Sequence, residues 1–250
     1  MTFEAFWGED YLLLEEEFLN FIKYVPLVEN HNEVWSMKLA NLLLLIGSSI
    51  DSFFKKALNY CLTVLTKEYY FNNHGKFHPR FFDFGKYQNQ LRNDRTNMGT
   101  FRDIFKEFYE FSDEPVYVLI SKRTLKPFSQ WSQGQSPDWW KVYRDLKHDR
   151  IKNREKCTLN ITLNALAALF FLNAYHVQSR KKLMEHRKVI NSNLNVGYLL
   201  VEMDERGNFK EKLNPIIAKT SLFGYIFKGH YYHYPWHILD PGHPQNVYHL

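Results

Sequence analysis

The clearest hydrophobic pattern in the chain is an apolar stripe that runs from Trp35 to Leu58. Its members recur at spacings of three and four residues, which is the period of one face of an α-helix. The stripe consists of Trp35, Leu39, Leu42, Leu43, Ile46, Ile50, Phe53, Phe54 and Leu58. The opposite face is polar and carries Lys38, Asn41, Ser49, Ser52 and Lys56. The pattern predicts a long amphipathic helix against a hydrophobic core.

Three other segments have helical patterns of different kinds. Residues 11–25 mix apolar side chains with three consecutive glutamates, which suits a short amphipathic helix that ends before Pro26. Residues 101–108 fit a second short helix, within a middle region where we otherwise expect loops. Residues 157–176 carry Leu, Phe and Ala on every side. This last segment therefore predicts a helix that is buried nearly all round.

A further helix has a recognisable start signal. Ser136 is a good N-cap residue, Pro137 suits the first helical position, and Asp138 adds negative charge to the first turn. We expect the helix to carry Trp139 to about Arg150.

The remaining regular patterns are β-prone. Residues 116–120 form a compact run of this kind, and residues 196–203 and 216–227 are two more, separated by a turn-like Asp-Glu-Arg-Gly-Asn sequence. The chain is thus expected to be mainly α-helical, with a helical domain over residues 1–190. A small β-containing C-terminal appendage over residues 191–250 is expected to pack on it.

Composition bears on the compartment. A chain of 250 residues with 45% hydrophobic content can bury a substantial core without disulfides. Its cysteines, Cys61 and Cys157, both lie in apolar segments, which is typical of buried thiols in a reducing compartment. The N-terminus lacks the pattern of a secretory signal, and the longest apolar stretch, residues 165–172, is too short to cross a bilayer. We therefore expect a cytoplasmic protein that does not enter a membrane.

Charge adds a weak indication about partners. The net charge is +5 and the isoelectric point is about 9.0. This balance is compatible with a polyanion such as RNA, although it falls short of a dense basic stripe.

The candidate chemistry lies on the helix that follows Pro137. Trp140, Arg144 and His148 follow one another at i, i+4 spacing, which predicts a ridge on a single face, flanked by Lys147 and Arg150. An imidazole that moves a proton beside a guanidinium that stabilises phosphoryl charge suffices for RNA cleavage without a metal. The same spacing also suits a solvated basic face, or a histidine that is hydrogen-bonded in the core.

Residues 139–150 and the helix at residues 160–172 resemble the second half of HEPN-type helical domains of prokaryotic toxins and defence proteins. Residues 48–55 resemble the first long helix of those domains. The resemblance covers about a third of the chain. It implies a helical bundle, usually a homodimer, whose active members are metal-independent ribonucleases that use an Arg and a His brought together across the dimer. Arg144 and His148 are the residues carried over by this resemblance.

The match departs from the family pattern in two details. The spacer between Arg144 and His148 has three residues, where the family has about four to six, and Asp145 replaces the polar residue that often follows the Arg. A second pair, Arg180 and His186, has a five-residue spacer but lies in a lysine-rich run.

Asp51 is the remaining candidate site residue. Its carboxylate could pair with Lys147 or His148 across the bundle and so orient the imidazole. The simpler alternative, an i, i+4 ion pair with Lys55 on the same helix, is favoured by the spacing.

No metal or cofactor is expected. The C-terminal tail is rich in histidine, but it has no nearby cysteine and only Asp240 as a carboxylate to complete a zinc site. Tyrosines and Trp236 lie among these histidines and are expected to pack or to stack on bases. The chain contains no phosphate-binding glycine loop, dinucleotide fingerprint or serine elbow.

The sequence leads to three functional hypotheses. The first is a metal-independent ribonuclease of a toxin or antiviral defence system, which acts on RNA as a homodimer and has an antitoxin or regulatory protein as a partner. The second is a non-catalytic helical module that binds RNA or a protein through the basic face around Lys147, Arg150, Lys152 and Arg154. The third is a structural dimerisation protein.

Overall fold

A computed structural model gives the fold of the chain. It describes residues 7–64, 97–108, 111–175, 189–191, 200–203, 209–212 and 216–226.

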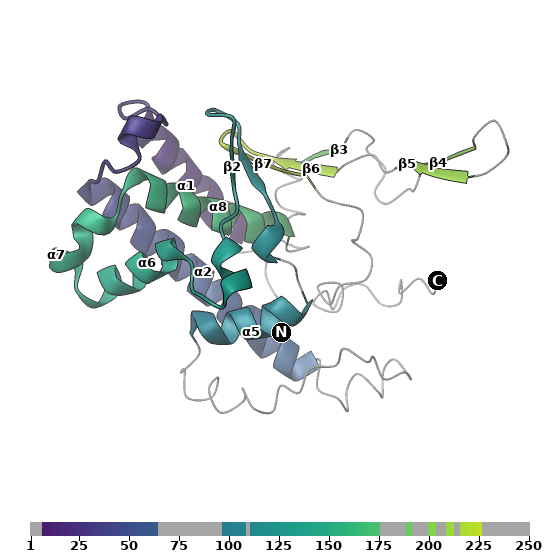
Figure 1. Cartoon of the computed structure of the whole chain (residues 1–250), viewed down its shortest axis with the longest axis horizontal. Helices are drawn as coiled ribbons and strands as arrows, with labels where there is room; N and C mark the ends of the chain where they lie inside the picture. The colour runs from purple at the N-terminus through teal and green to yellow at the C-terminus, as the bar shows by residue number, and fades with distance from the viewer. Residues whose placement is uncertain are drawn as a thin grey trace.

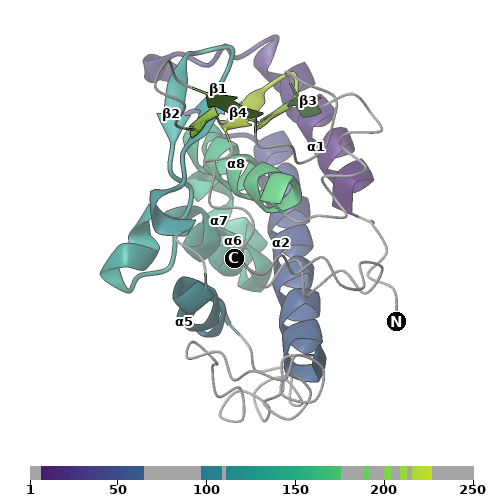
Figure 2. The same cartoon turned by 90° about the vertical axis from the view of Figure 1, so that its right-hand side faces the viewer.

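The helical body is organised around α2 (Met37–Val64) and α8 (Leu159–Tyr175), which pack against each other. Both helices also contact α1 (Trp7–Ile22) and α6 (Asp138–His148). Figures 1 and 2 show α2 running the length of the body, with α8 between it and the sheet.

The two central helices match their sequence patterns. In α2, the predicted stripe is buried from Leu39 to Phe54, and the positions expected to be polar are exposed or half-buried. The helix begins at Met37 because the Ser36 hydroxyl accepts a hydrogen bond from the Leu39 N–H at 3.1 Å. Every residue of α8 from 165 to 174 is buried, as its apolar composition predicts.

Helix α1 confirms the predicted amphipathic segment, but with an unexpected interior residue. Leu13 is 63% exposed, whereas Glu15 is only 3% exposed. The Glu15 carboxylate accepts hydrogen bonds from the Tyr11 hydroxyl at 3.0 Å and from the Leu222 N–H at 3.0 Å. It also accepts one from the Thr220 hydroxyl. Glu15 therefore fixes α1 to a turn of the sheet that lies about two hundred residues later in the chain.

An antiparallel sheet covers one side of α8. Its strand order is β2-β1-β7-β6-β3. The strands are β1 (Val116–Val118), β2 (Arg123–Leu125), β3 (Val189–Asn191), β6 (Ile216–Lys219) and β7 (Phe223–Ile226). Two aromatic contacts join the sheet to α8. Phe170 stacks on Phe223 with ring centroids 5.5 Å apart, and Phe171 contacts Tyr225 edge-on with ring centroids 5.2 Å apart.

Strand pairing crosses the boundary at residue 190 that the sequence predicts. Strands β1 and β2 come from the middle of the chain, yet β1 pairs directly with β7, where Tyr117 lies opposite Gly224. Strands β6 and β7 of the C-terminal region therefore join a sheet that also contains the central strands β1 and β2. A separate hairpin of β4 (Leu200–Met203) and β5 (Phe209–Lys212) lies apart from this sheet in Figure 1.

An aromatic cluster joins the body to the loop-rich middle of the chain. It connects α2 with three short elements, α5 (Met98–Phe108), η2 (Phe111–Asp113) and η3 (Ser129–Gln133). Its members are Phe54, Phe101, Phe111, Phe128, Trp131 and Phe171, whose rings contact one another at centroid distances from 4.7 to 6.3 Å. α5 confirms the short helix predicted around residues 101–108.

The described part of the chain is thus mainly helical with a small antiparallel sheet. One segment of α2, residues 37–56, is long and apolar enough to cross a membrane, and half of it is buried inside the protein. Buried core helices pass the same test of length and composition, so this property does not determine where the protein resides.

Candidate nucleic-acid interface

Helix α6 carries most of the predicted site residues, and its start differs by one position from the sequence prediction. Pro137 occupies the N-cap position, where Ser136 was expected. A side chain from η3 replaces the expected serine cap, because Gln130 Oε1 accepts a hydrogen bond from the Asp138 N–H at 2.7 Å. The Lys141 ammonium donates to the Asp138 carboxylate at 2.9 Å and holds its pKa below the usual value.

The buried side of α6 is aromatic, and Trp140 belongs to it. Trp140 is 7% exposed, and its ring centroid lies 5.0 Å from that of Tyr143. Arg144 and His148 are exposed. The three residues do not form one solvent-facing ridge, because each four-residue step advances about 40° beyond a full turn of an α-helix. Trp140 therefore helps to dock α6, and only Arg144 and His148 face solvent.

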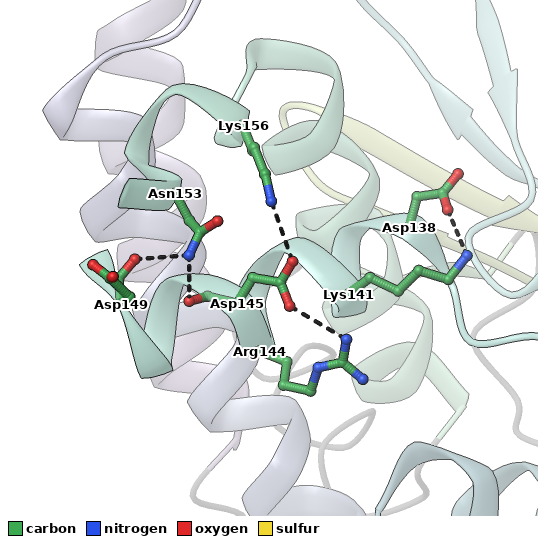
Figure 3. A network of polar contacts seen from close by, with 7 residues as sticks. All are labelled: Asp138, Lys141, Arg144, Asp145, Asp149, Asn153 and Lys156. Carbon is green, nitrogen blue, oxygen red and sulfur yellow. Dashed lines mark hydrogen bonds and ion pairs between the residues drawn. The ribbon is translucent and has the colours of Figure 1, made fainter. Parts of the chain in front are cut away.

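Arg144 belongs to a short chain of charged groups, which Figure 3 shows. One carboxylate oxygen of Asp145 lies 3.3 Å from the Arg144 guanidinium, and the other lies 3.4 Å from the Lys156 ammonium. Hydrogen bonding from Arg144, supported by Lys156, lowers the pKa of Asp145 below its usual value. Arg144 itself keeps 59% of its side chain exposed. The guanidinium is therefore accessible to a ligand but already has a carboxylate beside it.

His148 is the last residue of α6, and hydrogen bonds hold the turn that follows it. Asp149 follows it and caps α7 (Arg150–Asn153) by accepting a hydrogen bond from the Lys152 N–H at 3.0 Å. The Asn153 side chain donates to the backbone carbonyls of Asp145 and Asp149, both at 2.9 Å. The helix that the sequence predicts to reach about Arg150 is thus broken at Asp149. The described residues provide no hydrogen-bond partner for the imidazole of His148.

The other predicted residues have individual contacts. The Lys147 ammonium lies over the Tyr143 ring, 5.9 Å from its centroid. Arg150 donates a hydrogen bond to the side chain of Asn41 on α2. Asp51 pairs with Lys55 at 3.2 Å, which is the i, i+4 alternative for this residue, and it has no contact with Lys147 or His148 among the described interactions.

These residues form a basic surface, which we define as the exposed side of α6, α7 and η4 (Arg154–Lys156). Residues 138–156 contain seven Lys or Arg and four Asp or Glu, so they contribute three of the five net positive charges of the whole chain. The exposed cations are Arg144, Lys147, Arg150, Lys152, Arg154 and Lys156. An anionic ligand would meet several of them on one side of the body.

Sequence reasoning missed three contacts made by residues of this surface, which are Arg150 with Asn41, Arg154 with Trp35, and Lys156 with Asp145. Asn41 lies near the start of α2, Trp35 lies two residues before that helix, and Lys156 comes eleven residues after Asp145. None of these pairings follows a local spacing rule, because they arise where α7 and η4 pack near the start of α2 and where η4 approaches α6.

Several predicted features lie outside the described residues. They include the second candidate pair, Arg180 and His186, and the histidine-rich tail after residue 226. Within the described segments, no group of three or more His, Cys, Asp or Glu side chains is placed to hold a metal ion.

Comparisons with known proteins do not assign the chain to a family. No protein-family model matches it, and neither a curated protein nor a solved structure does so.

Proposed function

We propose that the basic surface binds RNA and that Arg144 and His148 cleave it without a metal ion. The observation that carries the proposal is the exposure of both side chains on one helix, one turn apart, among cations that would attract a phosphate backbone. A HEPN-like architecture is part of this proposal. It is supported by the resemblance of residues 139–150 to that family and by the mutual packing of α1, α2, α6 and α8.

The proposed chemistry is a transesterification within the RNA. The imidazole of His148 takes the proton of a ribose 2′-hydroxyl as that oxygen attacks the adjacent phosphorus. The bond from phosphorus to the 5′ oxygen breaks, and this oxygen takes up a proton from the imidazolium. Arg144 stabilises the extra negative charge on the phosphoryl oxygens. The products are a 2′,3′-cyclic phosphate and a 5′-hydroxyl end.

The wider setting is proposed on the same basis. The chain acts as a cytoplasmic homodimer in a toxin or antiviral defence system, and an antitoxin or other regulatory protein controls it. A dimer would also bring a second Arg144 and His148 close to the first pair.

The test uses labelled single-stranded RNA in excess EDTA. We expect cleavage to persist in EDTA, to leave 2′,3′-cyclic phosphate ends, and to stop on RNA with 2′-O-methyl groups. The variants His148→Gln and Arg144→Gln should lose cleavage. Asp103→Asn, which removes a carboxylate from the Arg102–Asp103 ion pair on α5, is the control and should cleave normally. Cleavage that His148→Gln leaves intact would refute the catalytic role.

A second function is favoured by two observations. Asp145 already neutralises part of the Arg144 charge, and the described residues give His148 no partner that would orient its imidazole. Both features suit a non-catalytic RNA-binding module that uses the same basic surface. RNA that binds in the assay above but stays intact would establish this function.

A further inference from the structure

Trp35 is an exposed aromatic residue at the edge of the basic surface. Trp35 is 39% exposed, although it lies only two residues before the start of α2. The backbone there is held in place, because Trp35 forms an antiparallel bridge with Thr158 and the Leu159 N–H donates to the Val34 carbonyl at 2.8 Å. The indole is thus presented to solvent from a fixed position.

Arg154 lies against this ring. Its guanidinium carbon is 5.8 Å from the centre of the Trp35 ring, which is within the range of a cation–π contact. Arg154 is exposed and belongs to η4, two residues before the Lys156 that reaches Asp145 on α6. The aromatic–cation pair therefore extends the basic surface from α6 toward the start of α2.

We propose that Trp35 and Arg154 form a subsite for one unpaired nucleobase of the RNA bound at the basic surface. This inference rests on the proposed function. A flat indole and a planar guanidinium both stack on the face of a base, and every base offers such a face. A base inside a duplex already has both faces stacked, so the subsite requires single-stranded RNA.

Two other exposed side chains, Tyr24 and Ile151, bear on which class of ligand this part of the protein binds. Tyr24 is 87% exposed. Among the described residues no cation lies over its ring, whereas Arg154 lies over the ring of Trp35. Ile151 is 82% exposed on α7, and together with the lysines it would also suit an anionic membrane surface. RNA is favoured because the planar guanidinium of Arg154 lies against the Trp35 ring, an arrangement that suits stacking on a nucleobase.

The first experiment compares probes with equal charge. Fluorescence anisotropy measures binding of the full chain to a single-stranded 2′-O-methyl RNA and to an oligomer with the same number of phosphates but no bases. We expect the abasic oligomer to bind at least about fivefold more weakly than the 2′-O-methyl RNA. A blunt duplex with the same total number of phosphates should bind more weakly by a similar factor. Equal affinity for the oligomers with and without bases would overturn the inference.

The second experiment uses matched variants. Trp35→Phe keeps an aromatic face and should keep most of the discrimination, whereas Trp35→Leu should bind both oligomers with equal affinity. The slope of log affinity against log salt should stay unchanged in both variants, because Trp35 contacts no phosphate. Tyr24→Leu is the control for loss of an exposed aromatic and should behave as wild type. Discrimination that survives in a folded Trp35→Leu would contradict the proposal.

The experiments distinguish failure of the nucleobase subsite from failure of the proposed function. If the wild-type chain binds neither oligomer, the proposed function is refuted together with the subsite. If it binds both equally and Trp35→Leu changes nothing, only the subsite is refuted. Binding to vesicles of anionic lipid that depends on Trp35, without any preference for bases in RNA, would replace the nucleobase with a membrane as the ligand and overturn the inference.

Discussion

The ring of Tyr143 on α6 lies directly against the backbone of Gly47 on α2. A Cβ atom added at Gly47 would fall 2.3 Å from Cδ2 of Tyr143, which is closer than non-bonded carbon atoms can approach. Since α6 carries Arg144 and His148, this contact sets the position of the candidate site relative to the bundle.

Gly47→Ala should therefore destabilise the protein, although alanine favours helix formation by about 1 kcal/mol over glycine. Forcing a methyl group into this contact should cost about 1–3 kcal/mol and lower the thermal midpoint. Ser48→Ala, at the next and exposed position, should leave the midpoint nearly unchanged. Adding Tyr143→Ala to Gly47→Ala should remove the clash, so the two substitutions should cost less together than the sum of their separate effects. Additive losses would show that the ring does not press on this glycine.

The buried phenol of Tyr143 should make the free energy of unfolding depend on pH in the alkaline range. Burial, reinforced by the negative charge of Asp51, raises the pKa of Tyr143 to about 12. Below pH 10 the phenol is protonated in both the folded and the unfolded chain, so this residue gives no pH dependence there. Between pH 10 and 12 the unfolded chain loses the proton first, and the free energy of unfolding should fall by at most about 1.4 kcal/mol per pH unit.

Urea unfolding at pH 9 and pH 11 measures this effect. Tyr143→Phe keeps the ring but cannot ionise, so it should lose less stability over the interval than wild type does. An identical loss in the two proteins would rule out Tyr143 as a source of the alkaline response.

Glu15 should matter more for stability than the glutamate beside it. Glu15→Ala leaves the Tyr11 hydroxyl, the Thr220 hydroxyl and the Leu222 N–H without their acceptor, which should cost about 1–3 kcal/mol. Glu16→Ala, at an exposed position, should change the free energy of unfolding by less than about 0.5 kcal/mol.

Hydrogen exchange locates the effect of Glu15. The amide of Leu222 should exchange faster in Glu15→Ala because it loses its acceptor, whereas amides in the middle of α8 should keep most of their protection. Unchanged exchange at Leu222 would contradict the role assigned to Glu15 as the link between α1 and the sheet.

The thiol of Cys157 should be unreactive in the folded protein. Its side chain is fully buried, and burial raises the pKa of the thiol to about 11. In a Cys61→Ser background, a thiol reagent at pH 8 should label Cys157 only on the timescale of unfolding, and 6 M guanidinium chloride should make labelling immediate. Rapid labelling of the native protein would show that the start of α8 opens readily.

Asp145→Asn tests the electrostatics of the basic surface. The substitution removes a negative charge that lies beside Arg144 and Lys156. RNA affinity should rise about three- to tenfold at low salt and by less at high salt, because added salt screens exposed charges. The change in stability should stay within about 0.5 kcal/mol, since exposed ion pairs contribute little. Asp103→Asn, away from this surface, should leave RNA affinity unchanged, and an equal gain in both variants would point to net charge alone.

Local patterns predicted the helices but not all of their contacts. The three- and four-residue spacing of α2 identified its buried face correctly, because an amphipathic helix must turn one stripe toward the core. The same logic was wrong for Trp140. This residue lies one turn before Arg144 on α6, but a step of four residues exceeds a full turn by about 40°, and the tryptophan faces the core. The same logic also failed for Glu15, where polarity suggested solvent but a distant turn supplies the donors that make burial acceptable.

The sequence by itself determined the mainly helical character, the apolar core of α2 and α8, and the clustering of positive charge in residues 138–156. These properties depend on residues that are neighbours along the chain. Only the tertiary structure decided that β1 pairs with β7, that Arg154 lies against Trp35, and that Lys156 reaches Asp145. Those contacts join segments distant in sequence, so their partners are chosen by how the helices pack and not by any local spacing.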